Sequence, residues 1–237
     1  MPVRSSDDIR PAGGAVDMVD AVAGQLIVSC QASSGSPLRH TPTIARLALS
    51  ALRGGAGALR VNGVEDIAAV RQSTGVPIIG LDKRLGVRRN VITETDEQVA
   101  ALVSVGADIV AVDATLEVVP DVAARVRAAV AHAGVPVMAD VSTLAEGLAA
   151  WDAGATFVGT TLSGYTPYSR MGTGPDLDLV AALAARGVRV LAEGRFQTPE
   201  QVAAAFGAGA HAVVVGGAIT DPVAITRRFV AAAPGPR

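Results

Sequence analysis

The sequence predicts a single α/β domain that folds as a (β/α)8 TIM barrel with a short N-terminal helix. Eight short apolar runs, each bounded by Gly, Pro or polar residues, alternate with helical segments along the chain. The 237 residues are close to the roughly 250 that such a barrel needs. Half of the residues are hydrophobic and only 3% are aromatic, which suits thin and closely packed elements. No shift in composition divides the chain.

Short apolar runs of this kind suit strands that are covered on both faces. The predicted strands are 26–30, 58–61, 77–81, 109–112, 136–139, 156–159, 188–192 and 212–215. An open doubly wound sheet alternates in the same way, but eight units are many for an open sheet. The first strand is also not followed by Gly-x-Gly-x-x-Gly. A closed barrel is therefore the predicted arrangement.

The helices are marked by capping residues at their starts and by glycines at their ends. Thr41 is expected to cap one helix, with Pro42 in its first turn, and Thr95 is expected to cap another. The predicted helices are 16–23, 41–53, 64–73, 95–105, 121–133, 143–153, 177–186, 198–206 and 222–232. The polar start, which contains Pro and Gly, is expected to form a mobile extension over residues 1–15, with the barrel over residues 16–237.

Composition and charge argue against several kinds of binding partner and location. A net charge of −2 argues against a nucleic-acid surface, which needs a concentrated basic stripe. No run approaches the roughly 20 apolar residues of a membrane span, and the N-terminus lacks the apolar core of a signal peptide. Cys30 is the single cysteine, so the chain cannot form an internal disulfide, which fits a reducing cytoplasm. Cys30 is expected to be a small buried residue. The three histidines lack metal-ligand spacing, so no metal site is expected.

Polar side chains follow most of the predicted strands. In a barrel, function lies where strands end and the following loops begin. Six of the eight strands deliver a charged or amide side chain to that rim, whereas the opposite strand ends are mostly Gly, Ala, Val and Pro. The six are Gln31, Arg60, Lys83, Asp113, Asp140 and Glu193. This asymmetry predicts an active site at the rim.

Lys83 follows the buried strand 77–81 and is the most informative of these side chains. A lone lysine there could simply mark where the strand reaches water. At the functional rim it can act as a base if part of it is neutral, and Arg60 and Arg84 could supply the positive charge that lowers its pKa. Asp82 is expected to point to the opposite side of the strand and receives no role.

Glycines at the last two strand ends predict a phosphate site. Gly194 and Arg195 follow the seventh strand, and Gly216 and Gly217 follow the eighth. Glycines let backbone N–H groups approach a ligand closely, and many barrels bind phosphate at this place. Residues 162–175 form a long polar loop that holds both tyrosines and is a candidate lid.

These residues carry a family likeness. From residue 24 to residue 229, the chain resembles the N-acetylmannosamine-6-phosphate 2-epimerase family, a ribulose-phosphate-binding-type barrel family that uses no cofactor. Members act in amino-sugar and sialic acid catabolism. The most specific matching segments are 26–32, 77–80 with Lys83 and Arg84, 139–143, 159–166, 192–195 and 216–220.

The resemblance implies an isomerase that interconverts N-acetylmannosamine 6-phosphate and N-acetylglucosamine 6-phosphate by proton transfer at C2. It implies Lys83 as the base and Glu193 as its supporting acid. The positions expected to bind sugar are Gln31, Arg60, Asp140, Thr160, Ser163 and Tyr165, and those expected to bind phosphate are Gly194, Arg195, Gly216 and Gly217. It also implies a homodimer, for which the apolar helix after residue 222 could supply the interface.

Two departures and two alternatives accompany this interpretation. Relatives often carry a basic residue where this chain has Asp221, and a basic segment where this chain has residues 114–120.

A lysine at a barrel strand end can also form a Schiff base with a sugar-phosphate aldehyde, which would give an aldolase. A phosphosugar-binding barrel without catalysis is the other alternative.

Overall fold

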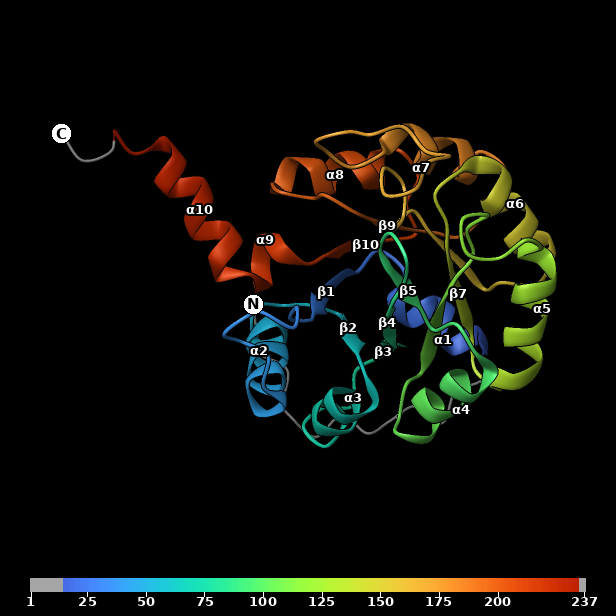
Figure 1. Ribbon diagram of the computed structural model, residues 1–237, viewed down its shortest axis with the longest axis horizontal. Coiled ribbons are helices and arrows are strands. Elements are labelled where there is room, and N and C mark those ends of the chain that lie inside the picture. The colour runs from blue at the N-terminus through green and yellow to red at the C-terminus, as the bar shows by residue number, and fades with distance from the viewer. Residues whose placement is uncertain (1–14, 235–237) are drawn as a thin grey trace.

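The computed structural model describes residues 15–234, which form a closed barrel of parallel strands surrounded by helices (Figure 1). The barrel strands are β1 (Leu26–Cys30), β2 (Ala58–Asn62), β3 (Ile78–Leu81), β6 (Ile109–Asp113), β7 (Val137–Asp140), β8 (Phe157–Gly159), β9 (Val190–Glu193) and β10 (Ala212–Val215). They close in the order β1-β10-β9-β8-β7-β6-β3-β2. The predicted (β/α)8 barrel is therefore confirmed. The expected extension over residues 1–15 lies, apart from Ala15, outside the described residues, and Ala15 already belongs to a helix.

The helices follow the predicted segments to within a few residues. They are α1 (Ala15–Val22), α2 (Thr41–Arg53), α3 (Val64–Arg71), α4 (Asp96–Ser104), α5 (Val122–Ala133), α6 (Leu144–Asp152), α7 (Leu177–Ala184), α8 (Pro199–Gly207), α9 (Gly217–Thr220) and α10 (Pro222–Ala232). Thr95 caps α4 in a capping box, as predicted. The prediction that Thr41 caps α2 is wrong. The N-cap residue is His40, and the Thr41 hydroxyl instead donates to the buried Asp66 carboxylate at 2.6 Å.

The inside of the barrel is filled by branched and aromatic side chains from alternating strand positions. Ile27, Ile79, Ile109 and Phe157 are fully buried in one cluster with Met18 of α1. The helix α1 therefore closes the N-terminal end of the barrel and leaves the C-terminal end open for a site. Two further apolar clusters lie between the strands and the outer helices. Within residues 15–234, no helix is long and apolar enough to span a membrane.

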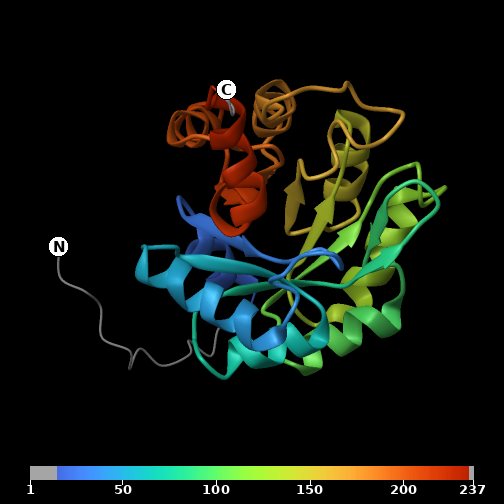
Figure 2. The same cartoon turned by 60° about the vertical axis from the view of Figure 1, so that its left-hand side comes forward.

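A β-hairpin follows β3, in a segment for which the sequence predicted no element. Its strands are β4 (Lys83–Leu85) and β5 (Asn90–Ile92), which pair antiparallel and project from the barrel (Figure 2). Lys83 is thus the first residue of the hairpin and does not belong to a barrel strand. Three-residue strands with charged side chains show no apolar alternation, so the periodicity of the sequence could not reveal them.

The helix α10 extends away from the barrel (Figure 1) and has no buried residue. Its side chains Phe229 and Val230 are 76% and 65% exposed. A groove of about 260 Å³ lies on the outside of β1, between α2 and α9. It is lined mainly by the small and apolar residues Leu26, Val28, Leu47, Ser50, Ala51, Gly54, Ala56, Ile219 and Thr220.

Candidate active site

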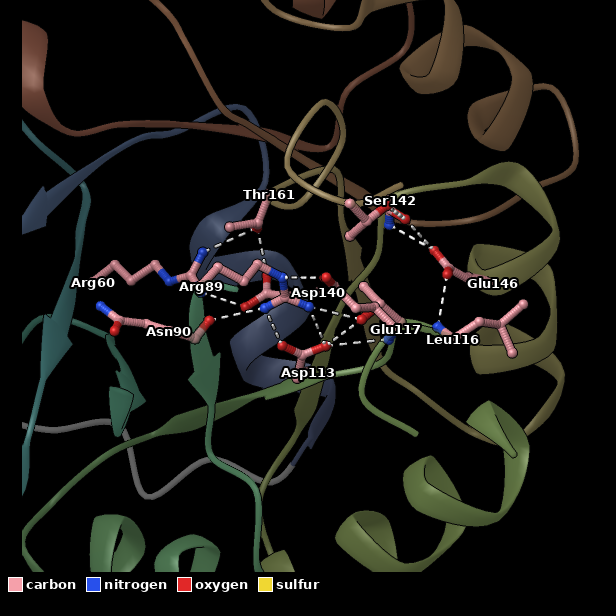
Figure 3. Close-up of polar contacts among 12 residues, drawn as sticks. Arg60, Arg89, Asn90, Asp113, Leu116, Glu117, Asp140, Ser142, Glu146 and Thr161 are labelled. Atoms are coloured by element: carbon pink, nitrogen blue, oxygen red, sulfur yellow. Dashed lines mark hydrogen bonds and ion pairs between the residues drawn. The ribbon is translucent and has the colours of Figure 1, made fainter. Parts of the chain in front are cut away.

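The guanidinium of Arg60 lies at the centre of the open end of the barrel (Figure 3). Its side chain is 1% exposed and forms ion pairs with Asp140 of β7 and Glu193 of β9. It also donates to the Thr161 hydroxyl at 3.2 Å, and that hydroxyl donates to Asp140. One cation therefore joins the ends of β2, β7 and β9 and the loop after β8. This cluster unites three of the predicted site residues.

The parallel register brings these side chains to one level. Asp140 pairs with Asp113 on one side and with Gly159 on the other. A side chain at Gly159 would not fit, because an added Cβ would lie 2.7 Å from Asp140 Oδ1 and 2.4 Å from Met138 Cε. The glycine at the end of β8 thus makes the room that the buried carboxylate occupies.

Lys83 lies beside this cluster, on the hairpin. Its backbone N–H donates to Asn62 Oδ1 at 2.8 Å, at the end of β2. The pKa of Lys83 is lowered from 10.5 to about 8, chiefly by desolvation and then by the Arg60 charge, while Asp140 opposes the shift. Lys83 is the only lysine among the 20 Lys and Arg residues of the chain. Arginine cannot give up its proton in proteins, whereas lysine with a lowered pKa can.

The residues next to Lys83 have structural partners. Asp82 accepts from Arg84 Nη2 at 2.8 Å and from Gln98 Nε2 at 2.8 Å, so it links Arg84 to α4.

Cys30 is fully buried, and desolvation raises its pKa to about 12. Cys30 is therefore a small core residue, as predicted, rather than a reactive thiol.

Two buried polar atoms of the site have no protein partner. Within residues 15–234 the buried side-chain atoms that lack a hydrogen bond are Gln31 Oε1 and Arg60 Nε. The amide nitrogen of Gln31 donates to Ser29 Oγ at 2.8 Å, which leaves its oxygen as a free acceptor. Unpaired buried groups are costly, and a bound ligand with a donor and an acceptor would satisfy both.

Other predicted sugar-binding residues lie outside this cluster. Thr160 uses its hydroxyl within the barrel wall, donating to Glu193 O at 3.0 Å and accepting from Glu193 N at 3.1 Å. Ser163 donates to Asp176 across the loop after β8. Tyr165 is 53% exposed, and its ring lies under the Arg195 guanidinium, with 5.4 Å from Cζ to the ring centroid. These three residues shape the loop and its attachment in the described structure.

The glycine-rich ends of β9 and β10 follow neighbouring parallel strands. Gly194 and Arg195 both have positive φ values, of 118° and 56°, and α9 begins at Gly217. The Arg195 side chain points elsewhere, because its Nε donates to Gly174 O at 2.7 Å and its Nη1 donates to Ser163 O. Asp221 caps α10 by accepting from Ala224 N at 3.1 Å, which accounts for a carboxylate at that position.

Several residues of the site were missed as site residues in the sequence. Asn62 accepts from the Lys83 backbone, and Arg89 joins the hairpin to Asp113. Thr161, which was placed at the predicted rim but given no role, accepts from Arg60. No local sequence pattern marks Asn62 or Arg89. For Lys83, by contrast, the presence of a single lysine in the chain was a signal that the sequence offered.

Within the described residues, no group of three His, Cys, Asp or Glu side chains is placed to hold a metal ion.

Comparison with known proteins gives a consistent result. Residues 44–234 match the family model NanE, described as "Putative N-acetylmannosamine-6-phosphate epimerase". The chain belongs to this epimerase family. A Caldanaerobacter subterraneus protein named "Putative N-acetylmannosamine-6-phosphate 2-epimerase" is 45% identical over 91% of this chain and 93% of its own length.

Two further members of the epimerase family extend the comparison. The solved structure of the N-acetylmannosamine-6-phosphate 2-epimerase from Clostridium perfringens superposes with a TM-score of 0.82. It is 40% identical, and the match covers 91% of this chain and 96% of that one. A bifunctional NanE/NanK enzyme of Brucella melitensis is 44% identical over 93% of this chain, which corresponds to 43% of that larger protein.

Replacing Arg60 tests the buried cluster. Arg60→Met leaves Asp140 and Glu193 without their cation, so the free energy of unfolding is expected to fall by about 3 to 5 kcal/mol. The loss should be smaller at pH 5 than at pH 8. Without the cation the pKa of Asp140 rises further above its unfolded value, and protonation then removes the buried charge. Urea denaturation at both pH values measures this, with exposed Arg127→Met on α5 as the control. An equal loss at both pH values would contradict the account.

Proposed function

We propose that this chain is an epimerase that interconverts N-acetylmannosamine 6-phosphate and N-acetylglucosamine 6-phosphate. The observation that carries the proposal is the position of the single lysine, with its lowered pKa, beside the buried Arg60 cluster. Family membership and the named activity of the Clostridium perfringens relative support the choice of substrate. An amino-sugar catabolic role and a cytoplasmic location follow from the same proposal.

In this mechanism Lys83 removes the proton from C2 of the open-chain sugar and returns it to the opposite face. The C2 proton is acidic only beside a carbonyl, so the aldehyde form reacts. At pH 7 a lysine with a pKa of about 8 is neutral in about one molecule in ten, against about one in 3,000 for an unperturbed lysine. Positioned bases of this kind contribute about 10² to 10⁴-fold to the rate.

The enolate that forms between the two proton transfers needs hydrogen-bond donors. Arg60 retains its buried Nε–H for this role, and Gln31 offers its free Oε1 to a hydroxyl or amide N–H of the sugar. Glu193 was expected to contact Lys83, but in the described structure its carboxylate binds Arg60 and Thr161, with no hydrogen bond to Lys83. Its proposed role is therefore to hold Arg60 in place, together with Asp140.

The phosphate is proposed to bind at the ends of β9 and β10. The backbone amides of Gly194, Arg195, Gly216 and Gly217 form the proposed cradle there, supported by the positive φ values of the first two. The contribution of Arg195 comes from its backbone, since its side chain is engaged with loop carbonyls. The loop after β8, with Ser163 and Tyr165, is proposed to cover the bound sugar.

We also propose that the chain forms a homodimer through α10. Phe229 and Val230 leave an exposed apolar face on a helix that extends away from its own barrel. The outside of β1 carries an apolar groove where the last helix of a barrel would otherwise pack. The α10 helix of a second copy would fill this groove and cover both surfaces at once.

Removing Lys83 tests the catalytic assignment. Lys83→Ala is expected to lower kcat at least about 100-fold and to abolish exchange of the C2 proton in heavy water, because no base remains. Lys83→Arg should be equally inactive, since arginine keeps its charge and cannot accept the proton. Proton NMR of N-acetylmannosamine 6-phosphate in each variant measures both effects. Exchange at the wild-type rate in either variant would remove Lys83 from the mechanism.

The dimer is tested by sedimentation. The wild-type chain is expected to sediment as a dimer at micromolar concentration, and Phe229→Glu should shift it to a monomer by placing a charge in the apolar contact. Tyr168→Ser, which removes an exposed ring from the loop after β8, should leave the dimer intact. A wild-type monomer, or a dimer unaffected by Phe229→Glu, would contradict the proposal.

A further inference from the structure

The proposed base lies on a short two-stranded hairpin outside the barrel sheet. The strands β4 and β5 have three residues each, with Lys83 opposite Ile92 and Leu85 opposite Asn90. An isolated two-stranded hairpin is at best marginally stable in water. The distance between Lys83 and the Arg60 cluster therefore depends on what holds the hairpin against the barrel.

Contacts at the base of the hairpin fix only where it leaves the barrel. Thr93 accepts from Asp82 N at 3.0 Å and donates its own N–H to Asp82 O at 2.8 Å, and Asn62 accepts from the Lys83 backbone. At the turn, the side chains of Leu85 and Val87 are almost fully exposed and pack against nothing. The apolar contacts of the hairpin come from β5, where Val91 and Ile92 are 8% and 2% exposed, so the turn itself has no apolar contact with the barrel.

Arg89, at the end of the turn, supplies the missing attachment (Figure 3). Its Nη1 and Nη2 donate to the two oxygens of Asp113 at 2.6 and 3.2 Å, and its Nε donates to Glu117 at 2.8 Å. The remaining two N–H groups donate to Asn90 O at 2.9 Å and Thr115 Oγ1 at 2.8 Å. An arginine has five N–H donors, so none is left for a ligand. Arg89 is built to tie two protein segments together.

The segment that receives Arg89 is hydrogen-bonded to the barrel. Asp113 ends the barrel strand β6 and pairs in register with Asp140 of the central cluster. In the loop that follows, Leu116 N donates to Glu146 Oε1 at 2.8 Å, and the other oxygen of the buried Glu146 accepts from Ser142 N at 2.8 Å. Figure 3 shows this second anchor next to Glu117. The hairpin is therefore tied to a fixed point of the barrel mouth.

We propose that Arg89 is a positioning residue for the reaction, which holds the β4–β5 hairpin, and with it Lys83, in place over the Arg60 cluster. This inference rests on the proposed function of Lys83. It also gives a purpose to Glu117 in the loop after β6, which accepts from Arg89 Nε.

Loss of the contacts made by Arg89 is expected to raise the pKa of Lys83. A hairpin that moves away from the barrel exposes the ammonium group to water and separates it from Arg60, which removes both causes of the lowered pKa. The carboxylate of Asp113, freed from Arg89, adds negative charge to the mouth and acts in the same direction. Both effects raise the pKa of Lys83 and misplace it, so kcat falls while groups that bind the sugar and phosphate remain in place.

The test compares Arg89→Ala with Arg88→Ala, an exposed arginine in the same turn. Arg89→Ala should lower kcat about 10 to 100-fold with little change in KM, since small misplacements of a reacting group cost this much. Arg88→Ala should match the wild type. Unchanged kcat in Arg89→Ala, or an equal loss in both variants, would overturn the proposal.

A second readout needs no substrate. Reductive methylation with ¹³C-formaldehyde labels Lys83 and the N-terminal amine, because the chain has no other lysine. The pH titration of the methyl-lysine NMR signal should show a pKa about one unit higher or more in Arg89→Ala than in Arg88→Ala. Equal pKa values in the two variants would overturn the proposal even if the wild-type chain lacked epimerase activity, so the two hypotheses fail separately.

If Arg89→Ala does not fold, Glu117→Gln decides the question. This variant removes one carboxylate partner of Arg89 and leaves the Asp113 pair intact. The value of kcat should fall, by less than in Arg89→Ala, because the hairpin keeps only the Asp113 part of its attachment. An unchanged kcat in Glu117→Gln would overturn the proposal.

Discussion

The buried guanidinium of Arg60 is the interaction on which the rest of the site depends. A charge at 1% exposure is strongly destabilising unless it is paired and hydrogen-bonded, and here Asp140, Glu193 and Thr161 meet that requirement from three different segments. Desolvation at the barrel mouth and, after it, the charge of the same cation lower the pKa of Lys83. The cluster thus fixes the strand ends to one another and prepares the neighbouring lysine to lose its proton.

The groups of the site come from two elements, the barrel and the attached hairpin. The barrel strands supply groups that stay in place, such as Arg60 and Asp140, within a closely packed wall. The group proposed to move a proton, Lys83, comes from a short ribbon that is held by Asn62 at its base and by Arg89 at its turn. This division lets a lysine remain partly open to water and still lie within the field of a buried arginine.

Local patterns in the sequence predicted most of the barrel, because strand runs, Thr caps and helix-ending glycines act over a few residues. The strand-end rule also brought Arg60, Asp140 and Glu193 to one rim, and the structure joins them. What escaped prediction depends on distant contacts. The pairing of Glu193 with Arg60, the tie from Arg89 to Asp113, and the direction of α10 away from its barrel are set by tertiary packing. Residues that follow a strand can be read from the sequence, but their partners cannot.

The pH dependence of kcat/KM tests the central claim most directly, which is that the Arg60 cluster and the barrel mouth keep Lys83 ready to act as a base. Conversion of N-acetylmannosamine 6-phosphate by the wild-type chain should be followed by proton NMR between about pH 6.5 and 9.5. A base must be neutral to accept a proton, so kcat/KM should rise with pH and level off above a pKa of about 8. A flat or falling profile over this range would contradict the account.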